Sequence, residues 1–236
     1  MTTQAVNAAV STRSNGWTFA ATATDGQWNV LIDDLSNSNL GILIPGQRID
    51  NVLSNYTGGV GAVRIQDAIT LAVKYRGFAS AAGYSNYESQ MMPPLQISPN
   101  DQLQMYTQPV DATANETNGL AWVTTNKGQQ ELFQVLGSID NADTELTTAI
   151  NGQSLGDVFF GTTINTINVQ LEDGASLSNV TIIDSQGGTV MTLYGGQRGI
   201  TAGSSGMQNL YSNGVFRGLS IAVGKGWKIQ VKTVTA

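Results

Sequence analysis

The C-terminal part of the chain alternates apolar and polar side chains with a period of two, and this alternation restricts the fold more than any other feature. Ile167, Val169 and Leu171 are separated by polar residues, as expected for a strand that buries one face. The runs 180–184 and 189–194 are rich in β-branched and aromatic residues, and the letters SQGG lie between them. Because glycine readily adopts the positive φ of a tight turn, these runs predict a β-hairpin.

The same alternation closes the chain. One apolar set is followed by the turn GKG and by a second set, in which Trp227, Ile229 and Val231 alternate with Lys228 and Lys232. We therefore expect the three apolar side chains to face the core and the two lysines to face solvent. The first apolar set consists of Leu219, Ile221 and Val223.

The N-terminal half repeats this pattern with longer interruptions. Turn-forming clusters such as DGQ, SNSN, SPND and NKGQ separate the apolar runs. The segment 45–56 is compatible with a short helix that has Ile49, Val52 and Leu53 on one side. The segment 63–75 fits both a helix and a strand, and we favour a strand for its second half. The predicted strands are 17–23, 28–33, 40–44, 69–75, 94–97, 102–107, 120–125 and 131–136.

The composition agrees with a fold made of strands. Charged residues are only 12% of the chain and apolar residues are 41%, and Asn, Gln, Ser, Thr and Gly take the place of the missing charge. These polar, uncharged residues suit turns and paired strands better than exposed helices. Many short strands and no long helix predict an all-β protein, an antiparallel β-sandwich of the jelly-roll or Greek-key type.

Two stretches of the chain, 94–107 and 218–233, carry apolar residues at the same spacing. A duplicated module would place these stretches at equivalent positions in two tandem sandwiches. A β-hairpin with a loop of four or five residues would produce the same spacing without duplication, so both interpretations stay open. The matched positions are Leu95, Ile97, Leu103, Met105 and Thr107 in the first stretch and Leu219, Ile221, Trp227, Ile229 and Val231 in the second.

The segment 137–145 has low hydrophobicity and is interpreted as a linker. It divides the chain into a first β-sandwich module, 16–137, and a second, 138–236. Residues 1–15 contain no apolar core like that of a secretory signal and are interpreted as a polar N-terminal arm. The arm is either a frayed terminus or a segment that becomes ordered against a neighbouring subunit.

The charge and the length of the apolar runs exclude several classes of partner. The net charge is −6 and the basic residues are scattered, which argues against direct binding of nucleic acid or anionic lipid. No apolar run is long enough to predict a membrane span. The chain has no cysteine, so disulfides and thiolate metal sites are excluded.

The sequence predicts no enzyme. With neither His nor Cys, the chain cannot build the usual Ser-His-Asp or Cys-His nucleophilic sites, or the common zinc sites. Paired carboxylates could still support glycoside hydrolysis, but neighbours in a strand such as Asp33 and Asp34 point to opposite faces. We therefore predict no catalytic, cofactor-binding or metal-binding residues and no cofactor. The carboxylates considered are Asp33, Asp34, Asp101, Glu116, Glu131, Asp140, Asp143 and Glu145.

Three loops have both an ordinary and a functional interpretation. The letters DDLSNSN and DNADTE offer oxygen ligands for calcium, but neither has the EF-hand pattern, and solvated turns explain them better. The glycine-rich segment 194–206 lacks the GK[ST] of a phosphate loop. It is either an ordinary surface loop or a contact loop that becomes ordered on assembly.

The aromatic residues are expected mainly in the core. Four tryptophans lie inside strand-like runs, where large aromatic residues usually pack inward: Trp17, Trp28, Trp122 and Trp227. Tyr84 and Tyr87 follow no alternating pattern and are the best candidates for exposed aromatic side chains. An exposed aromatic stripe on a sheet would instead indicate a sugar-binding surface.

Taken together, the polar N-terminal segment, the short strands joined by Asn, Gly and Ser loops, the divider at 137–145 and the repeated stretch resemble the small major capsid proteins of icosahedral viruses and phages. That family has one or two jelly rolls per chain. In double-module members, trimers form pseudo-hexameric capsomers. The resemblance implies a virion structural protein, a major capsid subunit that self-assembles through loops and sheet edges.

The partners expected from this resemblance are other copies of the chain, as a trimer or a larger shell, and other virion proteins. An alternative of a different class is a β-sandwich carbohydrate-binding or adhesive module, such as a phage receptor-binding or tail component. An enzyme acting on polysaccharide is a third hypothesis.

Overall fold

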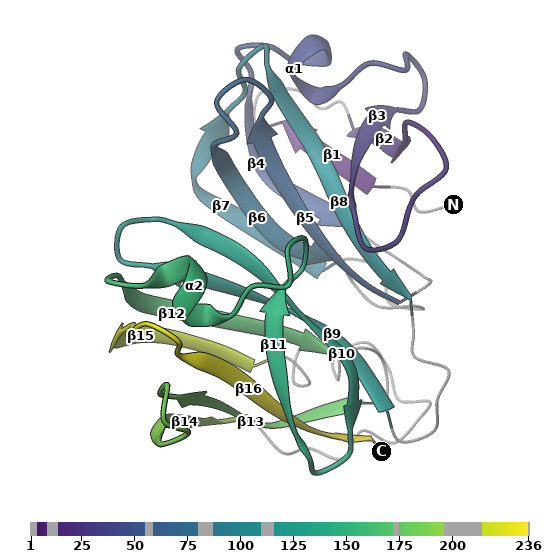
Figure 1. Ribbon diagram of the computed structural model, residues 1–236. Coiled ribbons are helices and arrows are strands. Elements are labelled where there is room, and N and C mark those ends of the chain that lie inside the picture. Colours follow the sequence, from purple (N-terminus) through teal and green to yellow (C-terminus); the bar gives the residue numbers. More distant parts are fainter. Residues whose placement is uncertain are drawn as a thin grey trace. The chain divides into compact units, whose positions relative to one another are not determined.

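A computed structural model describes residues 4–8, 14–54, 59–79, 87–109, 116–171, 175–195 and 214–235 (Figure 1). These residues form sixteen strands and two short helices, and each strand pairing with a resolved register is antiparallel. The prediction of an all-β antiparallel fold is therefore confirmed. The chain divides into two compact units, unit 1 over Met1–Gln108 and unit 2 over Pro109–Ala236. None of the helices in the described part of the chain is long and apolar enough to cross a membrane.

Unit 1 is one eight-stranded sheet with the order β6-β5-β8-β3-β2-β1-β4-β7. The strands at the two ends of this order, β6 and β7, also contact each other, so the sheet is almost closed into a barrel. Its elements are β1 (Gln4–Ala8), β2 (Ser14–Phe19), β3 (Trp28–Asp33), α1 (Leu40–Leu43), β4 (Arg48–Ser54), β5 (Gly59–Asp67), β6 (Val73–Ala79), β7 (Tyr87–Gln96) and β8 (Asp101–Pro109).

Unit 2 is a second eight-stranded sheet, with the order β14-β13-β16-β11-β10-β9-β12-β15. Its elements are β9 (Glu116–Thr125), β10 (Gln130–Ile139), β11 (Asp143–Thr148), α2 (Leu155–Phe159), β12 (Thr163–Leu171), β13 (Ala175–Ile183), β14 (Thr189–Tyr194), β15 (Gly214–Ala222) and β16 (Lys228–Thr235).

The two units have the same topology. Adding eight to each strand number of unit 1 reproduces the strand order of unit 2 at every position, and each unit has one short helix between its third and fourth strands. In unit 1, strands β4, β1, β2 and β3 lie side by side in the 4-1-2-3 order of a Greek key. The last strand, β8, lies between β3 and β5, and β1 lies between β2 and β4.

The equivalence extends to the register of the strands. Ile49 pairs with Leu95 in unit 1, and Ile164 pairs with Ile221 in unit 2. In both units the register shifts directly after this pair. The recurrence of this irregularity at the same position agrees with the duplicated module considered from the sequence.

The repeated stretch predicted from the sequence covers β7 and β8 in unit 1 and β15 and β16 in unit 2, which are equivalent strands. Two details of the prediction are wrong. The strands of each stretch do not pair with each other, because β7 pairs with β4 whereas β8 lies between β3 and β5. The stretch is thus an arch between two parts of the sheet, not a hairpin. The match is also shifted by two residues, since Leu95 is equivalent to Ile221.

Each unit has its own hydrophobic core, built from equivalent positions. Ile229 and Val231 are fully buried in the core of unit 2, and Trp227 is partly buried against it, whereas Lys228 is exposed, so the predicted register of this strand is confirmed. The equivalent core pairs are Trp17 and Phe133, Leu31 and Leu146, Leu40 and Leu155, Ile49 and Ile164, Ile65 and Ile182, Leu103 and Ile229, and Met105 and Val231.

The expected linker at 137–145 is wrong. Gly137 to Ile139 end β10, Asp143 to Glu145 begin β11, and residues 140–142 are the turn between them. The division between the units falls after Gln108, well before the expected boundary at 137 and 138. The low hydrophobicity of this segment belongs to an exposed hairpin tip, which composition does not distinguish from a linker.

The expected arm at 1–15 and two expected elements also need correction. Gln4–Ala8 form β1, which pairs with β2 and β4, and Ser14 begins β2. Residues 40–43 are helix α1 where a strand was predicted, and 48–54 are strand β4 where a helix was considered. In the ambiguous segment 63–75, residues 68–72 form a turn and β6 begins at Val73.

Candidate functional site

The connections that follow odd-numbered strands gather at one end of each unit, because neighbouring strands are antiparallel. In unit 1 the described connections are 34–47, 68–72 and 97–100, which we call the α1 end. In unit 2 they are 126–129, 149–162, 184–188 and 223–227, which we call the α2 end. Figure 1 shows α1 at the top of unit 1, among these connections.

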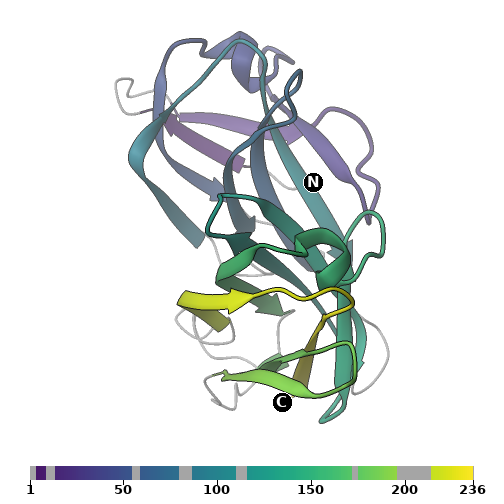
Figure 2. The ribbon, with the colours of Figure 1, turned by 60° about the vertical axis from the view of Figure 1, so that its left-hand side comes forward.

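We call the turn between the last two strands of each unit the arch turn; it is 97–100 in unit 1 and 223–227 in unit 2. Each helix packs its second residue, a glycine, against the arch turn of its own unit. A Cβ atom on Gly41 would collide with the backbone of Ser98 and Pro99, and one on Gly156 would lie 2.5 Å from the amide nitrogen of Trp227. Figure 2 shows α2 beside the turn that joins β15 to β16. Only glycine allows this close approach of two backbones.

Backbone hydrogen bonds fix the same contact in both units. Gly46 donates to the carbonyl of Ile97 at 2.8 Å, and the equivalent Gly161 donates to the carbonyl of Val223 at 3.1 Å. Both glycines have positive φ, 77° and 73° respectively. The sequence letters NLGILIPG and SLGDVFFG encode this helix in the two units.

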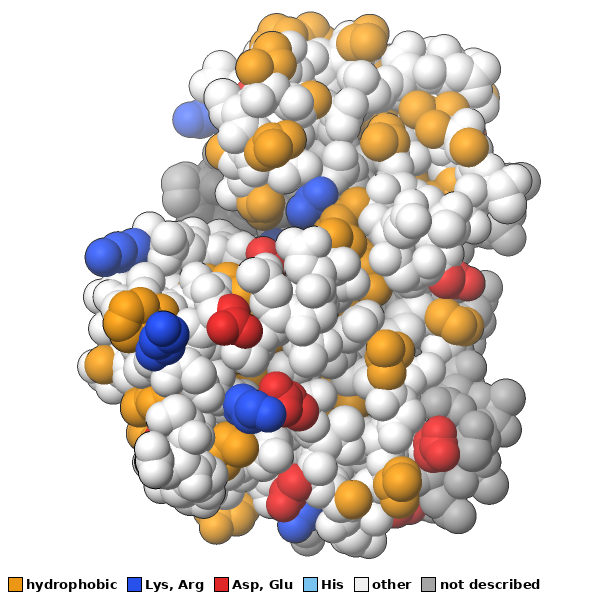
Figure 3. Space-filling model, in the orientation of Figure 1, with side chains coloured by type: hydrophobic (Ala, Val, Ile, Leu, Met, Phe, Trp, Pro, Cys, Tyr) orange, Lys and Arg blue, Asp and Glu red, His pale blue; other side chains and the backbone are white. Residues whose placement is uncertain are grey.

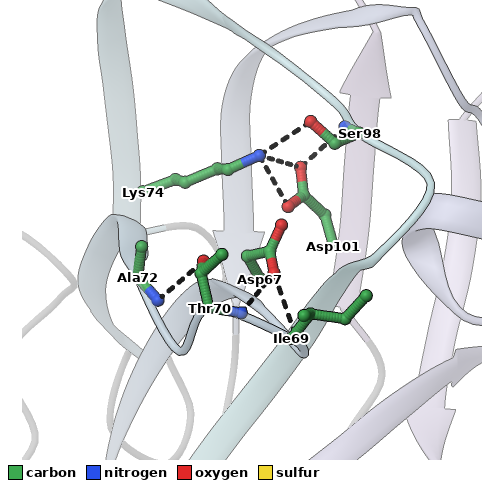
Figure 4. Close-up of polar contacts among 7 residues, drawn as sticks. All are labelled: Asp67, Ile69, Thr70, Ala72, Lys74, Ser98 and Asp101. Atoms are coloured by element: carbon green, nitrogen blue, oxygen red, sulfur yellow. Dashed lines mark hydrogen bonds and ion pairs between the residues drawn. The ribbon is translucent and has the colours of Figure 1, made fainter.

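In unit 1 a buried ion pair supports the arch turn (Figure 4). The Nζ atom of Lys74 lies 2.8 Å from Oδ1 of Asp101 and donates to the hydroxyl of Ser98 at 2.8 Å. The amide of Ser98 in turn donates to Oδ2 of Asp101 at 2.7 Å. The Asp101 side chain has no exposed surface and that of Lys74 is 25% exposed, so the carboxylate depends on this lysine for its charge balance.

In unit 2 an aromatic side chain takes the place of the ion pair. The amide of Asp101 donates to the carbonyl of Ser98, and the amide of Trp227 donates to the carbonyl of Gly224, so Asp101 and Trp227 are equivalent. The indole of Trp227 lies so close to Gly224 that a side chain at position 224 would collide with the indole. The same turn is therefore held by charge in one unit and by apolar packing in the other.

An aspartate stabilises the neighbouring hairpin turn in both units. Oδ1 of Asp67 accepts hydrogen bonds from the amides of Thr70 and Ile69 at 2.8 and 2.9 Å. Oδ1 of Asp184 accepts bonds from the amides of Gln186 and Gly188, both at 2.8 Å. The bonds from Thr70 and Ile69 lower the pKa of Asp67, with a smaller contribution from the charge of Lys74. These carboxylates therefore serve as turn caps.

Exposed apolar side chains concentrate at the α1 end. Leu35, Ile42, Ile69 and Leu71 are each at least 66% exposed, and all four lie in its connections. In the α2 end, Ile150 and Phe160 are exposed at 53% and 63%. Figure 3 shows hydrophobic side chains, in orange, across the top of unit 1, where Figure 1 places α1. Large exposed apolar groups of this kind are typical of contact surfaces.

Several of the carboxylates considered from the sequence have structural roles. Oδ2 of Asp33 accepts from the amide and hydroxyl of Ser36, which makes the DDLSNSN segment a capped turn. Glu145 pairs with Lys228 at 2.6 Å, and Asp143 lies 3.6 Å from Lys232. Within the described residues, no three acidic side chains come together as they would around a metal ion.

The remaining carboxylates lie in separate elements of the two units. Oε1 of Glu131 accepts from the amide of its neighbour Leu132, Glu116 begins β9, and Asp140 lies in the turn between β10 and β11. Asp34, in unit 1, is exposed next to the capped turn of Asp33.

The tryptophans are mostly buried, as predicted. Trp17 and Trp122 are at most 2% exposed, and Trp28 and Trp227 are partly buried. The ring of Trp28 contacts Tyr106 edge to face, and the guanidinium of Arg64 lies 4.0 Å from its centre. Because Arg64 covers one face of this ring, Trp28 is a poor platform for a sugar.

Some sequence predictions fall outside the described residues. These are Tyr84, the side chain of Tyr87, and the glycine-rich segment beyond Gly195. The Lys74–Asp101 ion pair leaves no local signal in the sequence, because these residues are distant in the chain. The two LG helices were not predicted either, although the shared letters LG followed by a glycine five residues later are a usable signal.

Comparison with known proteins gives no further assignment: no family model, curated protein or solved structure matches the chain.

Proposed function

We propose that this protein is a structural subunit that assembles with copies of itself, and that its assembled form is the shell of a virion. The observation that carries this proposal is the duplicated module, with the same strand order, register shift and helix in both units. Two similar modules in one chain give each subunit twice as many similar contact surfaces. Double-module capsid proteins use this arrangement to build pseudo-hexameric capsomers from trimers.

The surface of the two ends supports the same proposal. Leu35, Ile69 and Leu71 are exposed in turns that backbone hydrogen bonds to the carbonyls of Asp33 and Asp67 hold in place. Exposed apolar groups on a rigid support suit a permanent protein interface, since little conformational entropy is lost on binding. A chain with only 12% charged residues also has weak electrostatic protection against association.

A non-enzymatic role is part of the proposal. The chain has no His or Cys, and Asp33 caps a turn while Asp101 and Glu145 pair with lysines. The alternative of a carbohydrate-binding or adhesive module receives less support, because Arg64 covers the partly exposed Trp28.

The test is the oligomeric state of the purified full-length chain. We expect light scattering after size-exclusion chromatography to give a trimer or a larger species, and negative-stain electron microscopy to show rings or shells. A monomer at high concentration under several salt conditions would contradict the proposal. Retention of that monomer on a glycan array would favour the adhesive module instead.

A further inference from the structure

Strand β14 has a free edge among the described residues. It is at the end of the unit 2 sheet and pairs with β13 on one side. Its sequence, TVMTLY, contains no charged residue and no proline. Natural proteins usually protect such edges with charges, prolines or a covering segment, because an unpaired edge binds other strands.

The equivalent edge strand of unit 1 provides an internal comparison. Tyr75 pairs with Ile65 in β5, and Met191 pairs with the equivalent Ile182 in β13, so Tyr75 and Met191 are equivalent. One residue further along, Arg76 in β6 is therefore equivalent to Thr192 in β14. Unit 1 has a charged residue at the centre of this strand, and unit 2 has an uncharged β-branched residue that favours pairing.

The backbone of β14 is oriented for pairing outward. The amide of Gly195 donates to the carbonyl of Ser178 in β13, so the backbone N–H and C=O groups of Gly195 face β13. Since these directions alternate along an antiparallel strand, the N–H and C=O groups of Tyr194 and Thr192 face the free edge. Met191 and Leu193 pack against the core, and the side chains of Val190, Thr192 and Tyr194 lie on the opposite face.

We propose that β14 pairs antiparallel with β14 of a second copy of this chain, around a two-fold axis at Thr192. In this register Thr192 lies opposite Thr192, and Val190 lies opposite Tyr194 of the partner. Val190 is 40% exposed and Tyr194 is 78% exposed, and the pairing brings these exposed apolar side chains of the two strands into lateral contact. Thr–Thr pairs and aromatic pairs with β-branched residues are favourable across strands.

This inference rests on the proposed function for the identity of the partner, a second copy of the chain. The six residues of β14 give a small contact, which predicts a weak dimer in isolation and a useful contact within a larger assembly. The edge residues are uncharged, so the net charge of −6 is not concentrated where the two copies meet.

The absence of cysteine makes the register directly testable by cross-linking. In a hydrogen-bonded antiparallel pair, opposite Cα atoms are about 5.5 Å apart, within the range of about 4.4–6.8 Å that a disulfide spans. Under mild oxidation we expect Thr192→Cys to give at least tenfold more covalent dimer than Tyr194→Cys. Two Tyr194 residues would be roughly 13 Å apart in this register, although Tyr194 is the more exposed side chain.

A mixture of Val190→Cys and Tyr194→Cys chains is the second arm, and we expect it to form the mixed dimer while each variant alone does not. Equal cross-linking of Tyr194→Cys and Thr192→Cys, or no cross-linking of folded Thr192→Cys, would overturn the proposed register. These outcomes leave the proposed function intact if the chain still forms a trimer or shell.

A charge at the two-fold axis gives an independent test without cysteine. Thr192→Arg introduces the residue that unit 1 carries at this position, and we expect it to reduce the β14 contact at least tenfold by sedimentation velocity. The matched control is Thr181→Arg, because Thr181 lies opposite Thr192 on the neighbouring, non-edge strand. An equal effect of both variants, with equal melting temperatures, would show that charge on this face matters and that the edge does not.

Discussion

Asp101 and Trp227 occupy the same position in two copies of one fold. Each amide closes the arch turn of its own unit, at 3.0 Å from the carbonyl of Ser98 and 3.4 Å from the carbonyl of Gly224. Asp101 needs Lys74 as a partner, whereas Trp227 packs on Gly224 and the core. The two copies therefore have different sensitivities to mutation at one position.

Removal of the lysine partner should be costly in unit 1. We expect Lys74→Met to lower the free energy of unfolding by about 3 kcal/mol, because the fully buried Asp101 carboxylate would lose its counter-charge. Chemical denaturation measures this change. Lys232→Met, which removes a more exposed and longer pair with Asp143, is the control and should cost well under 1 kcal/mol. Equal losses would mean that Asp101 is not dependent on Lys74.

Removal of the indole should be costly in unit 2. We expect Trp227→Ala to cost about 3 kcal/mol, because it removes a large aromatic group packed against the core. Lys228→Ala, one residue further on and exposed, should cost less than 1 kcal/mol. A urea titration in which both variants lose the same stability would show that the register assigned to β16 is incorrect.

The two helix glycines should tolerate no side chain. Gly41→Ala and Gly156→Ala each place a methyl group within the backbone of the facing arch turn, and we expect losses of about 2 kcal/mol or more. Ile42→Ala, on the exposed side of α1, is the control and should change the melting temperature little. Wild-type stability of both glycine variants would contradict the close packing described above.

Deletion of residues 1–15 should disrupt unit 1. This deletion removes β1, which bridges β2 and β4 in the middle of the sheet, together with the first residues of β2. We expect loss of the near-ultraviolet dichroism signal of the aromatic residues of unit 1, including Trp17. The alternative expectation from the sequence, an arm that can be removed with little effect on the fold, predicts an unchanged melting curve for this variant.

Asp67 should make the stability of unit 1 depend on pH. The amides of Thr70 and Ile69 hold the pKa of Asp67 below its ordinary value, so its stabilising effect is present above pH 4 and is lost as the pH falls through the lowered pKa. The difference in melting temperature between wild type and Asp67→Ala should be largest near neutral pH and should shrink below about pH 4. Asp34→Ala, which removes an exposed carboxylate, serves as the control.

Pairing between strands that are adjacent in the sequence was predicted better than pairing between distant strands. The β13–β14 hairpin was predicted because its turn, Asp184 to Gly188, contains the residues that such a turn requires. The arch from β7 to β8 has a turn of similar length, and only pairing with distant strands distinguishes it from a hairpin. Such long-range pairing leaves no local signal, and the same limit hid the contact of Lys74 with Asp101.

Short apolar runs were the other source of error. Leu40 to Ile44 is as apolar as a buried strand, but Oδ1 of Asn39 caps the amide of Ile42 and starts a helical turn. Arg48 to Ser54 has apolar residues at helical spacing, although β1 and β7 pair with it on both sides. In runs this short, tertiary pairing decides between helix and strand, and periodicity does not.

The position of the last strand of each unit has a consequence for synthesis on the ribosome. β8 enters between β3 and β5, and β16 enters between β11 and β13, so each sheet receives its final strand in its interior. A nascent unit 1 must keep a gap between β3 and β5 until residues 101–109 emerge from the exit tunnel. During that interval two unpaired strand edges, those of β3 and β5, are exposed in one nascent chain, and mispairing with strands of other chains becomes a specific route to misfolding.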